Sequence, residues 1–502
     1  MKANKNRTRV ITGATTAILG MALISLVSCS SGESTSGQVT TGGSAGLLGP
    51  MVFVNNTGDK TLTSVAIKGD SGNAVVGTIP NTEFGNVALG DMQFSDGNWF
   101  FLNLAASNQV ATIDPLTGAT PIHEANLTTG TRPVHLYRDA IDGEVIWIMN
   151  DGDNAGGTLT PGDDLVNCAA QGGGSVTAVH NSHLGPGGTP PTVLGTTCLL
   201  ADGHKVAAFS SDAGVPKRVF VSSEDAGEIA VIDNDELSPT YRGMIARIDL
   251  CQTAKEASPC DSEQFTPITT AFTPNTSAPH GIRWSKLTQK VYSIQEGYGE
   301  ISEINPTTFV VTPIFDLAGS PYTSFGISPD GRFLLLRGDT TPATGTKLGV
   351  IDLGTAGNPV TNFTIPELAG TSPGSFKFSP DGKRFYILAG NAATATTKDK
   401  LFAFDTSTLT AATPALALLR AIPLVATGGH SFDVLAQPPL GAPVGTPGEA
   451  RYIVVSNSTD NSVSIINATD NQDKQKVIVG PTPGGVSVYF NGAAAGGHQA
   501  SS

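Results

Sequence analysis

The stretch Ile327-Ser328-Pro329-Asp330-Gly331 recurs as Phe378-Ser379-Pro380-Asp381-Gly382. In both places an apolar run ends in a Ser-Pro-Asp-Gly turn, and a second apolar run follows within a few residues. A third run then ends on Asp, as in Val350-Ile351-Asp352. A short polar side chain suits that place because it can bond the backbone of the next turn. The pattern predicts antiparallel β-strands.

Working outward, cycles of four such runs fill the chain at roughly 40–70 residues per repeat, which is typical of the blades of a propeller. The sequence therefore predicts an all-β protein, a single β-propeller of eight four-stranded blades. Seven blades are the alternative if an insertion in 139–273 disguises the count. The inner strands are predicted near 90–94, 134–138, 204–209, 280–284, 325–328, 376–379, 430–434 and 485–490.

The two ends of the propeller are predicted to close one blade together. Residues 51–79 supply three strands with no inner strand before them, and 485–490 is an inner strand with nothing after it. Joining them removes the exposed edge of an open sheet. We expect the propeller to span 51–491 and a disordered tail to span 492–502.

The Ser-Pro-Asp-Gly and Val-Ile-Asp elements resemble the YVTN-type propeller repeats of exported bacterial proteins, which are WD40-like in architecture. The resemblance covers about the whole mature chain. It implies the fold and not an activity.

The N-terminus has the features of an export signal. Positions 1–9 hold four basic and no acidic residues, and an apolar segment at 10–27 is too short and polar for a membrane span. Leu26-Val27-Ser28-Cys29 resembles the lipobox of bacterial lipoproteins. The resemblance implies a signal peptide over 1–28, lipid on Cys29, and a membrane-anchored protein of the periplasm or cell surface. In a Gram-negative cell Ser30 favours the outer membrane, and the Ser/Gly/Thr-rich remainder of 29–50 is a flexible tether.

Four further cysteines remain once Cys29 is lipidated: Cys168, Cys198, Cys251 and Cys260. Export permits disulfides, and four cysteines allow three pairings. Cys168–Cys198 with Cys251–Cys260 closes the shortest loops.

The charge argues against nucleic acid as a partner. The chain carries 29 basic and 43 acidic residues, and cleavage of the signal would leave 25 against 43, a net charge of −18. Such a surface repels phosphate backbones and concentrates cations.

Four histidines stand at the predicted starts of inner strands, where they would face one another across a central channel: His135, His204, His280 and His430. Two more, His180 and His183, could join them if their strand ends at the Asn-Ser between them. Neutral imidazole is a preferred ligand of zinc and copper, and its second nitrogen usually bonds a carboxylate. Carboxylates near enough in sequence are Asp139, Asp151, Asp153 and Asp202. Alternatively, each histidine is a polar residue that lines a wet channel.

The segments Arg132-Pro133-Val134-His135, Gly203-His204 and Pro279-His280-Gly281 are similar to segments of periplasmic zinc metallochaperone propellers. The resemblance implies that His135, His204, His280 and one of His180 or His183 hold zinc for delivery to a transport component. The chain departs from that family because it lacks a His-rich N-terminal stretch and an adjacent His-His pair.

Three functions remain open. The first is an anchored propeller that binds a transition metal, zinc in preference to copper, with a metal-transport component as its partner. The second is a surface scaffold that binds protein or glycan. The third is a redox enzyme with copper or haem, on the pattern of nitrous-oxide-reductase-like, thiocyanate-dehydrogenase-like or cytochrome d1-type propellers. We predict no catalytic residue and favour a binding protein over an enzyme. Gly370-Thr371-Ser372-Pro373-Gly374 matches the residue pattern of a nucleophile elbow, but it lacks the strand–turn–helix setting that exposes the serine.

Overall fold

The computed structural model describes residues 50–489 with gaps at 97, 116–119, 154–167, 169–172, 182–188, 200–201, 259, 261–272, 319, 321, 339–345, 392–398, 412, 427, 440–441 and 443–445. The predicted signal peptide, the lipidated Cys29, all but the last residue of the tether, the tail and His183 lie outside the described residues.

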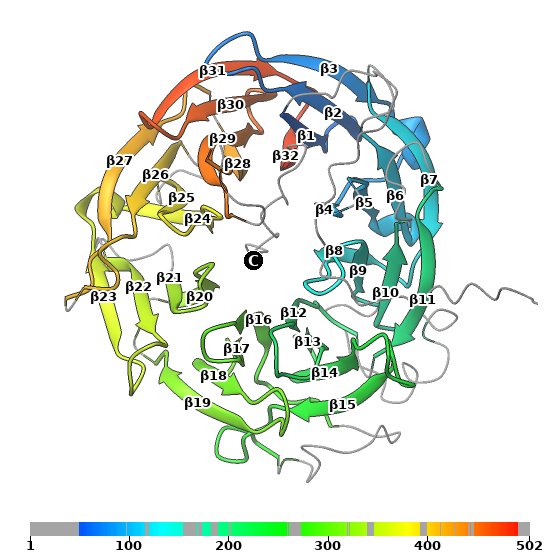
Figure 1. Ribbon diagram of the computed structural model, residues 1–502, viewed down its shortest axis with the longest axis vertical. Helices are drawn as coiled ribbons and strands as arrows, with labels where there is room; N and C mark the ends of the chain where they lie inside the picture. Colours follow the sequence, from blue (N-terminus) through cyan, green and yellow to red (C-terminus); the bar gives the residue numbers. More distant parts are fainter. Residues whose placement is uncertain are drawn as a thin grey trace, which may run out of the picture. The chain divides into compact units, whose positions relative to one another are not determined.

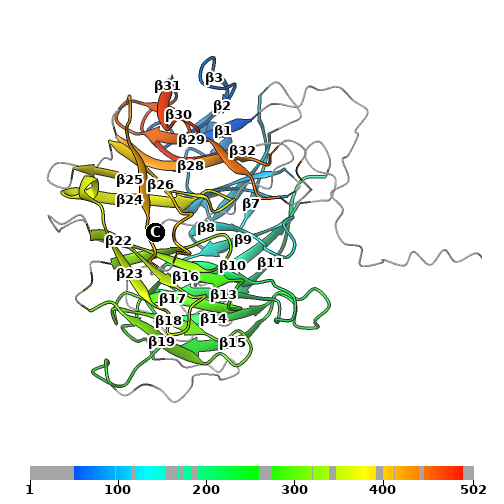
Figure 2. The same cartoon turned by 60° about the vertical axis from the view of Figure 1, so that its left-hand side comes forward.

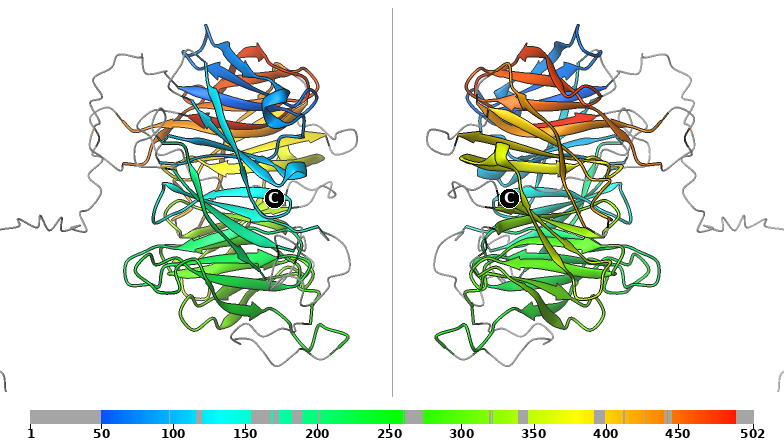
Figure 3. Two further views of the ribbon diagram at one scale, coloured as in Figure 1. Left: turned by 90° about the vertical axis from the view of Figure 1, so that its right-hand side faces the viewer. Right: turned by 90° about the vertical axis from the view of Figure 1, so that its left-hand side faces the viewer.

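Within that part of the chain, 32 strands form eight antiparallel sheets of four strands each. The sheets are arranged as the blades of a ring, which Figure 1 shows along its axis and Figures 2 and 3 show from the side. The predicted eight-bladed propeller is therefore confirmed, and the alternative of seven blades is wrong.

The first four blades follow the chain order from inside to outside. Blade 1 comprises β4 (Met92–Phe94), β5 (Phe100–Leu104), β6 (Gln109–Asp114) and β7 (Ile122–Thr128). Blade 2 comprises β8 (Pro133–Arg138), β9 (Val145–Asn150), β10 (Ser175–His180) and β11 (Thr192–Cys198). Blade 3 comprises β12 (Ala207–Ser210), β13 (Arg218–Ser223), β14 (Glu228–Asp233) and β15 (Met244–Asp249). Blade 4 comprises β16 (Pro279–Ser285), β17 (Lys290–Gln295), β18 (Glu300–Ile304) and β19 (Val311–Asp316).

The remaining blades complete the ring. Blade 5 comprises β20 (Tyr322–Ile327), β21 (Phe333–Gly338), β22 (Thr346–Asp352) and β23 (Val360–Thr364). Blade 6 comprises β24 (Thr371–Phe378), β25 (Arg384–Asn391), β26 (Lys400–Asp405) and β27 (Ala417–Pro423). Blade 7 comprises β28 (Gly429–Gln437), β29 (Glu449–Asn457), β30 (Ser462–Asn467) and β31 (Gln472–Ile478). Blade 8 comprises β32 (Pro483–Tyr489), β1 (Met51–Asn56), β2 (Thr61–Ala66) and β3 (Ala74–Ile79).

In the described part of the chain, three short 3-10 helices lie between strands: η1 (Asn81–Phe84), η2 (Ala105–Ser107) and η3 (Pro366–Leu368). Among the described residues, no helix has the length and apolar character needed to cross a membrane.

Blade 8 closes the ring in the predicted way. Strand β32, the inner strand from the C-terminal side, pairs antiparallel with β1, and Met51 stands opposite Tyr489. The side chains of Val52 and Phe53 are fully buried. Both edges of β1 are therefore paired, with β2 on one side and β32 on the other, which is the closure that the sequence pattern predicts.

The Ser-Pro-Asp-Gly stretches form the turns between the first two strands of blades 5 and 6. In blade 5 the Ser328 hydroxyl oxygen accepts a hydrogen bond from the Phe333 N–H at 2.9 Å, and Asp330 accepts from the Arg332 N–H at 3.1 Å. Gly331 has a φ of 77°, a conformation that a side chain would strain. Ser, Asp and Gly are each needed for the turn, which is why the motif recurs.

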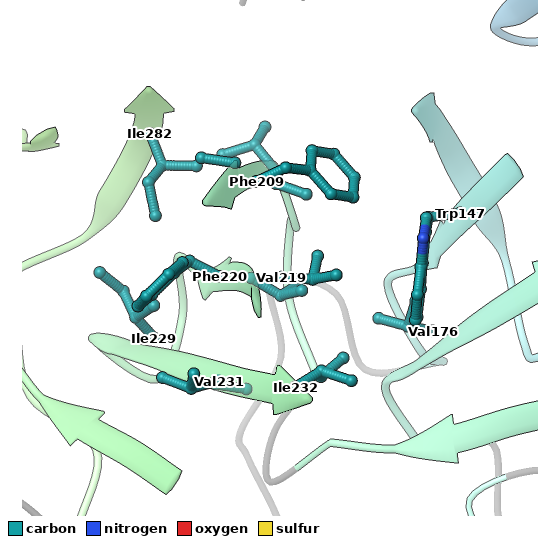
Figure 4. Close-up of a cluster of buried hydrophobic side chains, with 14 of the residues drawn as sticks. Trp147, Val176, Phe209, Val219, Phe220, Ile229, Val231, Ile232 and Ile282 are labelled. Carbon is teal, nitrogen blue, oxygen red and sulfur yellow. The ribbon is translucent and has the colours of Figure 1, made fainter. Parts of the chain in front are cut away.

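Buried apolar side chains fill each interface between neighbouring blades. The largest cluster joins blades 2, 3 and 4. In it Trp147 stands beside Val219 and Phe209, with Phe220 and Ile282 further along (Figure 4). This packing sets the inner strands of blades 2–4 side by side.

Two disulfides join the four cysteines that the structure describes. Cys168 bonds Cys198, and Cys251 bonds Cys260. The shortest-loop pairing is confirmed. Disulfides of this kind are typical of exported proteins.

Candidate metal centre

Three of the predicted histidines lie at the starts of the inner strands of neighbouring blades. His135 is the third residue of β8, His280 is the second residue of β16, and His204 lies three residues before β12. Each blade has four antiparallel strands, so the chain enters every blade from the same face. Since β8, β12 and β16 are adjacent around the ring axis (Figure 1), the three imidazoles come from one side of one face.

The imidazoles of His135 and His204 are in direct contact. Their Nε2 atoms are 3.1 Å apart, and their ring centroids are 4.8 Å apart. The His280 ring lies beside His204 with a centroid separation of 5.3 Å. The three side chains are 18–26% exposed, so solutes can reach them.

Each of the three histidines has a carboxylate at its Nδ1 atom. His135 Nδ1 is 3.5 Å from Asp91 Oδ2, and His204 Nδ1 is 3.4 Å from Asp151 Oδ2. His280 Nδ1 is 3.2 Å from Glu296 Oε1. A carboxylate at this position holds the proton on Nδ1 and leaves the Nε2 lone pair free for a metal, which is the arrangement found behind metal-binding histidines.

Backbone contacts hold the first two carboxylates in place. Asp91 immediately precedes β4, and its Oδ2 also accepts from the Leu136 N–H at 3.1 Å. Asp151 immediately follows β9, and its Oδ1 accepts from the Lys205 N–H at 3.2 Å. These contacts join blade 1 to blade 2 and blade 2 to blade 3, so each of the two histidines is held by its neighbouring blade.

The segment before β12 has a conformation that brings His204 inward. Gly203 has a φ of 96°, and a Cβ there would lie 2.8 Å from Asp225. Lys205 is fully buried, and its Nζ donates to the Gly203 carbonyl at 2.8 Å. Only glycine fits this bend. The bend also explains why β12 begins at Ala207 and not at the predicted residue 204.

The electrostatic environment of the third histidine favours its protonated form. The hydrogen bond to Glu296 raises the pKa of His280 above its usual value, against the effect of burial. Two residues beyond His135, burial raises the pKa of Tyr137, so this phenol stays neutral at physiological pH.

The other predicted ligands lie elsewhere. His430 is exposed at the start of β28 in blade 7, on the opposite side of the ring from blade 3 (Figure 1). His180 ends β10 opposite Val145, with its Nε2 3.7 Å from Glu144, whereas His135 pairs at the other end of that sheet with Met149. His183 lies outside the described residues. The structure therefore brings together three of the six.

Of the four aspartates predicted to support the histidines, Asp151 does so. Asp139 instead accepts hydrogen bonds from Trp147 Nε1 and Asn234 Nδ2, both at 2.7 Å. Asp153 is exposed, and Asp202 is buried against Gly152.

Asp91 and Glu296 were not among the residues predicted from the sequence. A signal for Glu296 was present, because Glu296 and Asp151 each stand sixteen residues after the histidine of their own blade, directly after the second strand. Asp91 had no such signal, because it stands 44 residues before His135, ahead of the first strand of blade 1.

Within the described residues, no group of three or more His, Cys, Asp or Glu side chains is placed so that it could hold a metal ion without a side-chain movement. The geometry fits a zinc ion in part. Two nitrogens bound tetrahedrally at about 2.0–2.1 Å would be about 3.3–3.4 Å apart, close to the 3.1 Å between His135 and His204. His280 would have to turn toward them to complete a three-histidine set.

Comparisons with known proteins define the fold and no family. No family model matches the chain, and no curated protein matches it, so the YVTN type is not confirmed. The fold is similar to apo AztD from Citrobacter koseri, at 12% identity and a TM-score of 0.50 over 88% of this chain and 98% of that one. The periplasmic gluconolactonase PpgL of Pseudomonas aeruginosa matches at 16% identity and a TM-score of 0.46, over 76% and 94% of the two chains. Saccharomyces cerevisiae Sqt1 matches at 12% identity and a TM-score of 0.48, over 81% of this chain and 90% of that one.

These likenesses show the propeller fold alone. The fold and the site together define a class, an eight-bladed propeller with a cluster of three carboxylate-backed histidines at the inner rim of one face.

Proposed function

We propose that this protein is a lipid-anchored, extracytoplasmic propeller that binds a transition metal ion, zinc in preference to copper, through His135, His204 and His280. The observation that carries the proposal is the 3.1 Å separation of the His135 and His204 Nε2 atoms, each ring having a carboxylate behind it.

The proton positions explain why this pair favours a cation. When Asp91 and Asp151 hold the protons on the two Nδ1 atoms, both Nε2 atoms carry lone pairs. Two lone pairs facing each other at 3.1 Å repel, unless a proton or a metal ion lies between them. The carboxylates therefore organise the pair for a positive charge before the metal arrives.

The donor set favours zinc. Three imidazoles bound through deprotonated Nε2 atoms and an open fourth position suit a tetrahedral ion, and binding would displace the proton that the environment of His280 favours. The four cysteines that the structure describes are all in disulfides and offer no thiolate to a softer ion. His180 and His430 lie away from the cluster, which argues against the larger histidine sets of copper-cluster enzymes.

The role we assign is binding and transfer at a membrane surface. The segments around the three histidines are those that resemble zinc metallochaperone propellers. The acidic chain, with a net charge of −14, attracts cations. An ion held by partly exposed histidines with an open position can pass to a second protein, such as a metal-transport component.

The test is metal analysis of untagged protein, followed by competition titration against a chromophoric zinc chelator. We expect one zinc per chain. His135→Ala and His204→Ala should each weaken binding by at least about 100-fold, because even the partners behind metal ligands are worth 10–100-fold.

The matched control is His430→Ala, which removes an exposed histidine at the equivalent strand start of blade 7. It should bind zinc like the native protein. Absence of stoichiometric metal, or an equal loss in the His430 variant, would leave the scaffold function as the better account.

The anchor is tested separately. Cys29→Ser should move the protein from the membrane fraction to the soluble fraction without changing its zinc affinity. Retention of the variant in the membrane fraction would contradict the lipidation.

A further inference from the structure

A disulfide-closed loop contacts the blade that carries His280. The loop begins at Cys251, just after β15, and Cys251 is bonded to Cys260. It lies against the turn of residues 296–299 between β17 and β18, which carries both Glu296 and Tyr298.

Tyr298 is the main contact between the loop and the turn. Its hydroxyl accepts a hydrogen bond from the Gln252 N–H at 3.1 Å and donates to Glu256 Oε1 at 2.6 Å. Lys255 Nζ donates to the Tyr298 carbonyl at 3.1 Å and pairs with Glu300 at 2.5 Å. The turn is thus bonded to the loop through both side chain and backbone.

The same loop holds the segment that leads into His280. Glu256 Oε1 accepts from the N–H and from the hydroxyl of Thr276, both at 2.7 Å. Although burial opposes it, the hydrogen bonds from Tyr298 and Thr276 lower the pKa of Glu256, so it remains a carboxylate acceptor. One side chain of the loop therefore binds the turn and the strand approach together.

The turn and the strand approach also bond each other directly. The Glu296 N–H donates to the Ala278 carbonyl at 3.1 Å, and the Gly297 N–H donates to the Ser277 carbonyl at 3.0 Å. These two bonds couple the turn that carries Glu296 to the segment immediately before His280.

His280 needs this support more than the other two histidines. The carboxylates behind His135 and His204 are 14% and 4% exposed and accept backbone hydrogen bonds from the next blade. Glu296 is 38% exposed and belongs to the same blade as His280.

We propose that the loop closed by Cys251–Cys260 is a clamp that positions His280 and Glu296, with Tyr298 as its key positioning residue, so that metal affinity depends on it. The inference rests on the proposed metal-binding function. It assigns a role to one of the two disulfides and to a tyrosine that touches no metal ligand.

The experiment compares three variants by zinc competition titration. The double variant Cys251→Ser/Cys260→Ser opens the loop, and Tyr298→Phe removes only the hydroxyl. We expect each to weaken zinc binding by about 10-fold, the lower end of the effect of supporting residues. The matched control, Cys168→Ser/Cys198→Ser, removes the other disulfide, at the outer strand of blade 2, and should bind zinc like the native protein.

Hydrogen exchange of the metal-free proteins supplies a readout that needs no zinc. The Glu296 and Gly297 amides should exchange faster in the loop variants, while the Gly203 amide, which donates to the Asp151 carbonyl, should not change. Unchanged zinc affinity in both loop variants, or an equal loss of affinity in the control, overturns the proposed clamp and leaves the proposed metal-binding function standing. A native protein that binds no zinc overturns the proposed function and this inference with it, and faster exchange would then report a purely structural contact.

Discussion

Replacing Asp151 by asparagine tests the central feature of the site, the control of the imidazole proton. The substitution keeps the shape of the side chain and changes one oxygen to an NH2 group. In the native protein the two carboxylate oxygens have separate partners, since Oδ1 accepts from the Lys205 N–H at 3.2 Å and Oδ2 faces His204 Nδ1 at 3.4 Å. Asparagine has one acceptor oxygen, and the two donors stand at different oxygens of this side chain, so the amide cannot serve both.

The orientation of the new amide decides the outcome. Lys205 is fully buried, and depriving its N–H of an acceptor would cost about 1–3 kcal/mol. We therefore expect the amide oxygen to stay on Lys205 and the NH2 group to face His204 Nδ1. That nitrogen must then become an acceptor, and its proton moves to Nε2, the atom that lies 3.1 Å from His135 Nε2.

A proton on Nε2 occupies the position that the metal needs. Loss of a partner behind a metal ligand weakens binding by about 10–100-fold, which is about 1.4–2.7 kcal/mol. We expect the upper end of this range for Asp151→Asn, because the metal must also displace the misplaced proton.

Two measurements check this prediction. Chelator competition gives the zinc affinity, and long-range proton–nitrogen correlation spectra of the metal-free variant show which nitrogen of His204 is protonated. The control is Asp153→Asn, an exposed position two residues away that should bind zinc like the native protein. Native affinity in the Asp151 variant, or an unchanged His204 tautomer, would refute the reasoning.

Three further predictions follow from single contacts. Asp91→Asn should weaken zinc binding by only about 10-fold, because one oxygen accepts both the His135 Nδ1–H and a backbone N–H and the amide oxygen can replace it; a loss equal to that of the Asp151 variant in the same titration would contradict this. Arg332→Ala should lower the free energy of unfolding by about 1 kcal/mol at pH 7, because it removes the bidentate pair with Asp352. That pair lowers the pKa of Asp352. Its stabilisation is therefore present above the pKa of Asp352 in the unfolded chain and is lost as the pH falls through the pKa of Asp352 in the folded protein. Urea unfolding should therefore show a difference at pH 7 that shrinks toward pH 2, and a constant difference would argue against it. Phe220→Ala should cost about 3–5 kcal/mol, because the ring is fully buried between blades; a thermal unfolding temperature equal to the native one would contradict the packing.

Much of the fold was predictable because its turns and strands depend on residues that are close together in the sequence. In the Ser328-Pro329-Asp330-Gly331 turn, the Ser328 and Asp330 side chains accept hydrogen bonds from backbone N–H groups a few residues further on, so the residue types of the motif specify the turn. Strand alternation and repeat length gave the blade count, and the unmatched strands at the two ends gave the closure. Blade boundaries were less predictable, since β12 starts late because of the bend at Gly203.

The metal centre was predictable only in part. Equivalent positions in successive repeats pointed to His135, His204 and His280, and the structure brings these three side by side. The same reasoning included His430, which occupies the same strand position but lies in a blade across the ring. Position within a repeat is encoded locally, whereas distance around the ring depends on which blades are neighbours.

The amino-acid sequence determined the repeating unit, the closed ring and the acidic net charge, because each depends on neighbours within a few residues or on composition. Only the tertiary structure decided which histidines meet and which carboxylates stand behind them. Asp91 reaches His135 from another blade, Asp151 does the same for His204, and the loop at Cys251 holds the turn of Glu296. These contacts join segments 44–53 residues apart, and packing between blades, which no local pattern encodes, creates them.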